Sequence, residues 1–142
     1  MSGVEDRPPG AEFATEVDCR LDDASFVAEA QGSRVFRLNH GEGSLRDEKG
    51  GDFDRNIRHL TKSAARIDKA RREGKSVWVH CHMGINRGPA GLIAYLLIHT
   101  DTPSLHAAFR AVKAIRSKAR TRSNTFASEL AAIAARAGKS AD

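Results

Sequence analysis

The segment that most constrains the fold is residues 77–89, which read VWVHCHMGINRGP. Three consecutive apolar residues, Val77–Val79, are typical of a short strand that is buried on both faces of a parallel sheet. The strand leads into His80 and Cys81, and the next apolar run begins at Pro89, a residue that favours the first turn of a helix. A strand, a short loop and a helix in this order predict an α/β fold. They place the loop at the carboxyl end of a central strand, where such sheets bind ligands.

The composition of this loop favours the binding of an anion. Gly84 and Gly88 let the backbone approach a ligand closely, and successive N–H groups in such a curl form an anion-binding nest. Arg87 has a planar guanidinium that matches two phosphate oxygens, and the following helix adds its positive end. In this field the pKa of Cys81 is expected to fall below that of a free thiol, so that the thiolate attacks a bound phosphate. The predicted phosphate-binding residues are His82, Met83, Gly84, Ile85, Asn86, Arg87 and Gly88.

The arrangement His80-Cys81-x5-Arg87 resembles the signature loop of the cysteine-dependent protein tyrosine phosphatases, His-Cys-x5-Arg. The Arg-Gly-Pro continuation resembles the Arg-Ser-Pro of their compact dual-specificity branch. The resemblance covers residues 13–137. Outside residues 77–89 it concerns the order of strands and helices and not sequence identity. It implies a dual-specificity-phosphatase fold, with a mostly parallel central sheet flanked by helices. It also implies nucleophilic attack by Cys81 and no need for a metal or an organic cofactor.

Other kinds of cysteine site fit the segment less well. A buried structural cysteine would not explain the glycines, the arginine and the proline at these spacings. A zinc site at His80, Cys81 and His82 would need a second Cys/His cluster, and the sequence has none at zinc spacing. A rhodanese-type loop is usually shorter. The low-molecular-weight phosphatases carry their cysteine near the N-terminus, whereas here it lies in the middle of the chain.

The rest of the chain alternates strand and helix patterns in a single domain over residues 13–137, between a flexible tail at 1–12 and a C-terminal tail at 138–142. Residues 39–52 have four glycines and no periodicity, and such long loops tend to carry function. Strands are predicted over 13–21, 35–38 and 77–79, and helices over 24–31, 53–73, 89–99, 105–115 and 123–137.

The composition excludes several classes of protein. No apolar run approaches the roughly 20 residues that a membrane span needs, and the polar N-terminal segment lacks the apolar centre of a signal peptide. Two cysteines argue for a reducing compartment, so we expect a cytoplasmic protein. We also expect a monomer. The net charge of +5 favours anionic partners. Nucleic acid is not favoured, because no aromatic stacking platform is visible.

The resemblance implies a carboxylic acid that donates a proton to the leaving group, on a mobile loop before the cysteine. The loop at 39–52 offers Glu42, Asp47, Glu48 and Asp52. Asp52 is best explained as the cap of the next helix. Asp47 lies mid-loop and is our choice, with Glu42 as the alternative. A mechanism without an acid stays open.

Gly88 departs from the family, which usually has Ser or Thr there to donate to the thiolate. Asn86 offers an amide nearby, although in such loops this side chain usually points outward or toward neighbouring loops. His80 resembles the histidine that organises the loop in the family. A run of four basic residues lies between the last two helices; it is either a solvated turn or a site for a second anionic group of the substrate. These residues are Arg116, Lys118, Arg120 and Arg122.

The sequence therefore predicts a protein tyrosine or dual-specificity phosphatase that acts through a phosphocysteine. Its substrate is a phosphorylated protein or another phosphomonoester, and phosphate or vanadate inhibits it. Two alternatives stay open: a phosphate-binding module with weak or no turnover, and a phosphatase that acts on lipid or RNA phosphates.

Overall fold

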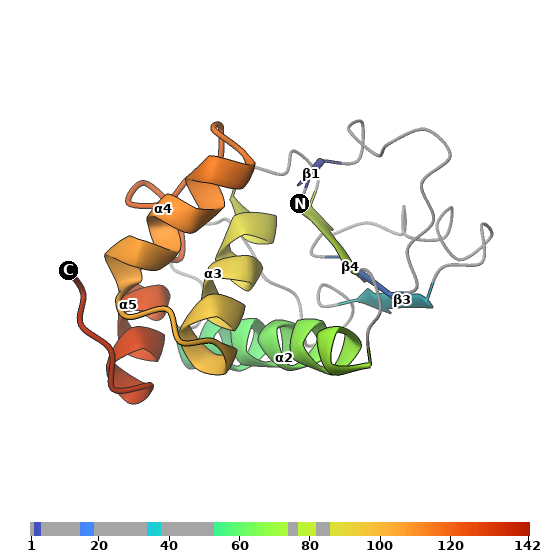
Figure 1. The fold of residues 1–142 in the computed structure, drawn as a ribbon, viewed down its shortest axis with the longest axis horizontal. Helices are drawn as coiled ribbons and strands as arrows, with labels where there is room; N and C mark the ends of the chain where they lie inside the picture. The colour runs from blue at the N-terminus through green and yellow to red at the C-terminus, as the bar shows by residue number, and fades with distance from the viewer. Residues whose placement is uncertain (1, 4–14, 19–33, 38–52, 74–76, 82–85) are drawn as a thin grey trace.

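The structure, a computed structural model, describes residues 2–3, 15–18, 34–37, 53–73, 77–81 and 86–142 (Figure 1). The described strands form one sheet in the order β1-β4-β2-β3, and every pairing in it is parallel. The α/β fold with a mostly parallel sheet, predicted from the sequence, is thereby confirmed. The strands are β1 (Ser2–Gly3), β2 (Thr15–Asp18), β3 (Arg34–Arg37) and β4 (Val77–Cys81).

The register of the sheet makes β4 a central strand. Val79 lies opposite Val17 of β2, and Cys81 lies opposite Gly3 of β1 on the other side. The strand is longer than the predicted 77–79, so Cys81 is its last residue. The sequence pattern did not predict β1, which pairs Ser2 and Gly3 with the end of β4.

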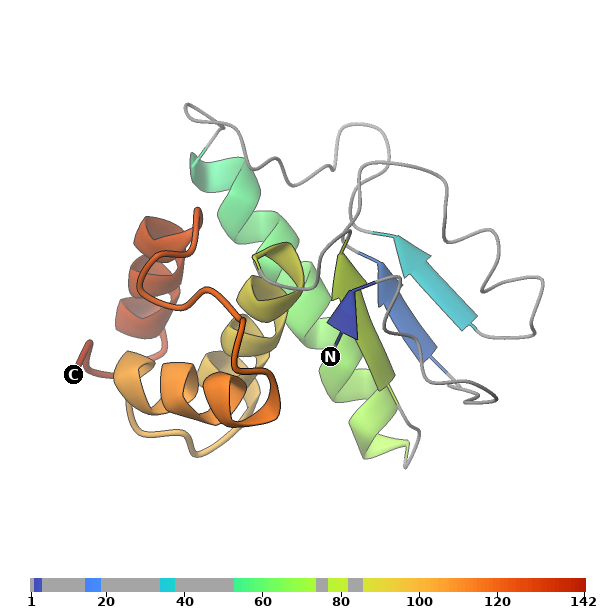
Figure 2. The ribbon, with the colours of Figure 1, turned by 90° about the horizontal axis from the view of Figure 1, so that it is seen from above.

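Four described helices stand beside the sheet (Figure 2). α3 is in the middle of them and contacts β4, α2, α4 and α5. α2 contacts β2 and β4 as well as α3, whereas α4 and α5 lie on the side of α3 that is remote from the sheet. The helices are α2 (Phe53–Arg72), α3 (Arg87–His99), α4 (Leu105–Ile115) and α5 (Ala127–Arg136). The helix predicted over 24–31 lies outside the described residues.

The apolar periodicity of α2 and α4 explains how they pack. In α2 the residues at steps of three and four, among them Ile57, Leu60 and Ala64, are buried. α4 starts as predicted, because Ser104 Oγ accepts a hydrogen bond of 3.1 Å from the N–H of Ala107. Ile115 continues the apolar spacing of Phe109 and Val112, but as the last residue of the helix it is exposed.

The boundaries of α3 and α5 differ from the predicted ones. α3 begins at Arg87, so Pro89 is its third residue rather than its first; it still lies in the first turn, where a missing N–H breaks no helical hydrogen bond. α5 begins at Ala127 and not at Ser123. The reason is a turn in which Asn124 Oδ1 accepts a hydrogen bond of 2.9 Å from the N–H of Phe126.

The core lies where the four helices meet. Phe126, Leu60, Ile93, Leu97 and Leu130 are all at most 1% exposed, and they come from three helices and the turn before α5. The C-terminal segment also contacts this unit, since Ser140 O accepts a hydrogen bond from the N–H of Leu105. Among the described residues, no helix combines the length and the apolar character that a membrane crossing requires.

Candidate active site

The backbone of Cys81 ends the central strand β4 at the carboxyl edge of the sheet. A short connection leads from there to Asn86 and to Arg87, the first residue of α3, and α3 packs against β4. The described parts of the signature loop, which we define as residues 81–87, therefore lie where the sequence predicted them. Parallel α/β sheets form their ligand sites at this edge.

Arg87 is buried, with 8% of its surface exposed. The residues that follow it in α3, from Gly88 to Ala90, are buried as well. A guanidinium presents fixed N–H donors that match the oxygens of an oxyanion, and the start of the helix places partial positive charge at the same point. The two positive features together make this point suited to an anion.

Asn86 occupies the position directly before α3, where an asparagine commonly caps the helix with its side chain. Here it makes no cap hydrogen bond to the helix. Its side-chain oxygen Oδ1 accepts a hydrogen bond of 2.9 Å from the backbone N–H of Thr125 instead. The Asn86 oxygen thus points toward the α4–α5 loop (residues 116–126), which is one of the two directions that the family resemblance implied.

Asn124, in the α4–α5 loop, completes a second link to the same residue. Its Nδ2 donates hydrogen bonds to the backbone oxygen of Asn86 at 2.9 Å and to that of Arg120 at 3.0 Å. Asn124 and Asn86 are each 4% exposed. The hydrogen bond from Asn124 Nδ2 to the Asn86 carbonyl is buried, and the one from Thr125 is partly buried. The start of α3 is therefore tied to the loop that precedes α5.

Sequence analysis did not identify Asn124 as a site residue. The sequence pattern predicts a helix over 123–137, so residues 123 and 124 belong to its first turn, with no separate role. The contact with Asn86 joins residues 38 positions apart, and no local pattern carries that information.

Gly88 is the second residue of α3 and is buried. Its backbone is helical, and among the described residues Gly138 alone has a positive φ. The glycine is therefore not required here by a left-handed backbone conformation.

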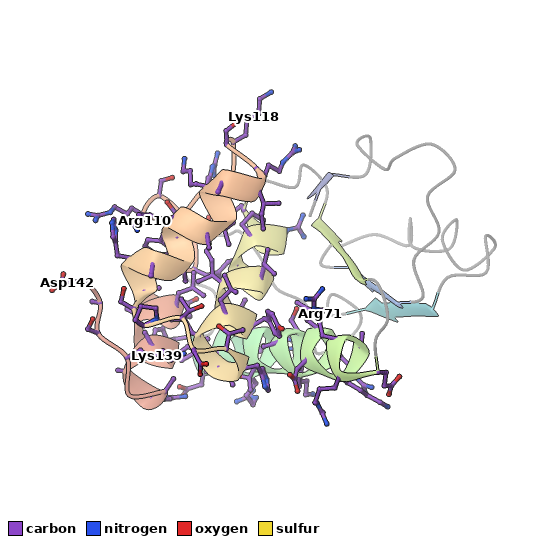
Figure 3. All side chains as sticks on the ribbon, viewed as in Figure 1. Arg71, Arg110, Lys118, Lys139 and Asp142 are labelled. Carbon is purple, nitrogen blue, oxygen red and sulfur yellow. The ribbon has the colours of Figure 1, made fainter. Side chains whose placement is uncertain are left out.

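The basic residues of the α4–α5 loop lie beside this region. Lys118, Arg120 and Arg122 are exposed, and Lys118 projects outward near the tip of the loop (Figure 3). Arg122 Nη2 lies 3.2 Å from His106 Nδ1 on α4. Because the carbonyl groups of Arg120 and Asn86 share one donor, this loop runs close to the start of α3.

Several predicted site residues lie outside the described residues. These are His82, Met83, Gly84 and Ile85 in the signature loop, and the acid candidates Glu42, Asp47, Glu48 and Asp52. For Cys81 and His80 the structure describes the backbone only. In the part of the chain that the structure describes, no three His, Cys, Asp or Glu residues cluster as metal ligands would.

A model of the catalytic domain of dual specificity phosphatases matches residues 42–135. Dual specificity protein phosphatase 12 of Mus musculus is 33% identical over 64 residues, and that of Homo sapiens is 34% identical over 64 residues; both matches cover 45% of this chain. They cover 19% and 18% of those relatives, so the chain matches about a fifth of their length.

Solved structures resemble this one over most of its length. A variant of human DUSP28 has a TM-score of 0.74 and 26% identity, covering 95% of this chain and 84% of its own. A mouse dual specificity phosphatase in complex with zinc tungstate has a TM-score of 0.72 and 26% identity, covering 89% of this chain and 72% of its own.

Proposed function

Since this chain belongs to the dual specificity phosphatase family, we propose that it hydrolyses phosphoric monoesters through a phosphocysteine intermediate. The observation that carries the proposal is the position of Arg87. This arginine is buried at the start of α3, one short loop after the strand that ends in Cys81. A phosphate group in that loop would meet a guanidinium and a helix N-terminus at the same time.

In the first half of the proposed reaction, the Cys81 thiolate attacks phosphorus in line with the ester oxygen. The S–P bond forms as the P–O ester bond breaks. Asp47 gives its proton to the departing oxygen, so the product leaves as an alcohol or a phenol. Arg87 and the N–H groups of the loop hold the other phosphate oxygens and stabilise the charge that develops on them.

In the second half, a water molecule attacks the phosphocysteine. Asp47, now a carboxylate, takes a proton from the water as its oxygen bonds to phosphorus. The P–S bond breaks, and inorganic phosphate and the Cys81 thiolate are released. The role of Asp47 rests on the family resemblance alone, and Glu42 is the alternative acid.

We propose phosphorylated proteins as the substrates, with phosphate and vanadate as inhibitors and the cytoplasm as the compartment. Tungstate in the mouse relative supports the inhibitor proposal, because tungstate and vanadate are tetrahedral oxyanions like phosphate. The presence of two cysteines in the chain supports a reducing compartment.

One observation favours a second candidate function, a phosphate-binding module with weak turnover. Gly88 has no hydroxyl to stabilise the thiolate when it leaves phosphorus. Phosphocysteine breakdown would then be slow while phosphate binding stayed intact, because the binding groups are Arg87 and the loop N–H groups.

The test of the proposed function is hydrolysis of an aryl phosphate by the wild type and by Cys81→Ser. We expect the variant to lose turnover and to keep the rise in melting temperature caused by millimolar tungstate, because the anion binds the folded state. Rapid acid quench of the wild type with a labelled substrate should trap phosphate on Cys81. A Cys81→Ser enzyme with near-normal turnover would overturn the assignment of the nucleophile.

A further inference from the structure

Asn86 and Asn124 form a reciprocal pair of links between the signature loop and the α4–α5 loop. Asn124 Nδ2 donates to the backbone oxygen of Asn86 at 2.9 Å. In the other direction, the Asn86 side-chain oxygen accepts from the N–H of Thr125 at 2.9 Å. Each asparagine side chain therefore holds the backbone of the opposite loop. We call this pair of links the asparagine clamp.

The clamp acts on the residue directly before Arg87. Two oxygens of Asn86, one on its backbone and one on its side chain, are held from outside the helix. The same backbone oxygen also accepts the N–H of Ala90 at 3.0 Å, the first hydrogen bond of α3. The start of the helix, and with it the backbone of Arg87, is thereby fixed relative to the α4–α5 loop.

Hydrogen bonds also hold Asn124, on the far side of the clamp. Asn124 Oδ1 accepts the N–H of Phe126 at 2.9 Å, and Phe126 is 1% exposed in the core. Asn124 Nδ2 also holds the carbonyl of Arg120 within its own loop. The Asn124 side chain thus makes three hydrogen bonds to backbone atoms, of Asn86, Arg120 and Phe126. The Phe126 side chain is buried in the core.

The side chain of Asn86 is also kept away from the end of its own helix. An asparagine in this position normally bonds to an N–H of the first helical turn, the same groups that an oxyanion would use. Here Pro89 at the third helical position has no N–H, and the Asn86 oxygen bonds to Thr125 instead. The clamp therefore prevents a self-capping contact that would compete with a phosphate group.

From this arrangement we infer that Asn124 is a positioning residue for Arg87, acting through the backbone of Asn86. The inference rests on the proposed phosphatase function, since it assigns the clamp to the arginine that binds phosphate. The guanidinium must match two phosphate oxygens, and displacement of a binding group by about 1 Å can cost on the order of 10²-fold in rate. The clamp fixes the backbone from which the Arg87 side chain projects.

The variant that tests the inference is Asn124→Ser. A serine oxygen can still accept the N–H of Phe126, as hydroxyls do in such turns. The shorter side chain has no second polar atom to reach the Asn86 carbonyl. Asn124→Ser therefore removes the link that Asn124 makes to the Asn86 carbonyl and spares the turn before α5. Asn124→Ala removes both that link and the hydrogen bond of the turn.

The matched control is Asn56→Ala. Asn56 is 5% exposed, and its Nδ2 donates to Glu129 Oε2 at 2.9 Å, which links α2 to α5. The Asn56→Ala variant loses a hydrogen bond of an equally buried amide side chain and leaves the contacts at the start of α3 unchanged. At a temperature where every variant is fully folded, we expect Asn124→Ser to lower kcat by about 10-fold or more and to weaken tungstate binding. Asn56→Ala should lower the melting temperature and leave both constants near the wild-type values.

A purely structural role predicts another pattern, in which Asn124→Ser and Asn56→Ala differ only in melting temperature. That result would overturn the inference, as would rescue of kcat by serine relative to alanine at position 124. Failure of the proposed phosphatase function can be distinguished from failure of this inference. If the wild type has no turnover, tungstate affinity still reports the position of Arg87, and an unchanged affinity in Asn124→Ser would refute the inference.

If the wild type binds no oxyanion either, the proposed function fails, and amide hydrogen exchange decides the clamp by itself. The amides of Thr125 and Ala90 donate to Asn86. We expect both to exchange faster in Asn124→Ser, with exchange in the middle of α3 unchanged. Equal exchange at both amides in variant and wild type would show that Asn124 does not hold the start of the helix.

Discussion

Gly88 is the position at which the chain departs most from the pattern of its family, and Gly88→Ser tests the consequence. The residue is the second of α3, next to Arg87, and it has a helical backbone. A serine can adopt that conformation without strain, since the left-handed region is not involved. The substitution therefore adds a hydroxyl at the predicted thiolate site and requires no change of φ at residue 88.

Two effects of different size are expected. Replacing glycine by a residue of ordinary helix propensity should raise the free energy of unfolding by about 0.5 kcal/mol. A hydrogen bond to a charged group contributes about 1.5–3 kcal/mol, and here it would stabilise the Cys81 thiolate as it leaves phosphorus. Since 1.36 kcal/mol corresponds to a factor of ten in rate, phosphocysteine breakdown should accelerate by about 10- to 100-fold.

The assay is stopped-flow hydrolysis of an aryl phosphate in excess over the enzyme. If breakdown limits the wild type, a burst of one equivalent of phenol precedes slow steady turnover. Gly88→Ser should lose the burst and turn over faster. Gly88→Ala is the matched control, because it adds the same Cβ to a buried position and gains helix propensity without a hydroxyl; it should keep the burst.

Two results would refute this reasoning. The first is a wild type without a burst, together with a serine variant of unchanged rate, which would mean that another group already stabilises the thiolate. The second is equal acceleration by serine and alanine, which would assign the effect to the helix and not to the hydroxyl. A fall in melting temperature in both variants would identify steric crowding instead.

Three further predictions concern the arginine, the acid and a buried histidine. Arg87→Lys keeps the charge but loses the bidentate geometry, so kcat/KM should fall by about 10²-fold. A change of only a few-fold would show that Arg87 has a structural role and does not bind the phosphate of the substrate. Asp47→Asn should slow alkyl phosphates strongly and aryl phosphates weakly, because a good leaving group needs no proton; the same selective loss in Glu42→Gln instead would transfer the role to Glu42. Burial, and after it the neighbouring Lys62 and other cations of α2, lower the pKa of His59, so the folded protein favours the neutral ring. Its contribution to the free energy of unfolding should be constant above the unfolded pKa of about 6.5 and decline as the pH falls below it; urea denaturation of His59→Gln should show a shallower decline, and identical pH profiles would refute the assignment.

The sequence by itself determined the features that depend on neighbours along the chain. The apolar run at 77–79 and the glycines, arginine and proline after it specified a central strand, a loop and a helix, and the structure places β4 and α3 accordingly. The cap of α4 is also local, because the Ser104 oxygen accepts a hydrogen bond from the N–H of Ala107, three residues away. The spacing of the cysteine and arginine also identified the family, since the motif is local.

Tertiary structure alone decided the features that join distant residues. The asparagine clamp depends on contacts across 38 and 39 positions, and the pairing of β1 with β4 joins the two ends of an even longer stretch. The position of Asn124 in a turn, and not in the first turn of α5, follows from bonds that its amide makes elsewhere. Hydrophobic periodicity specifies which face of an element is buried, but it does not specify which polar groups meet once the faces have packed. In the inference drawn above, such polar groups, those of Asn86 and Asn124, position Arg87.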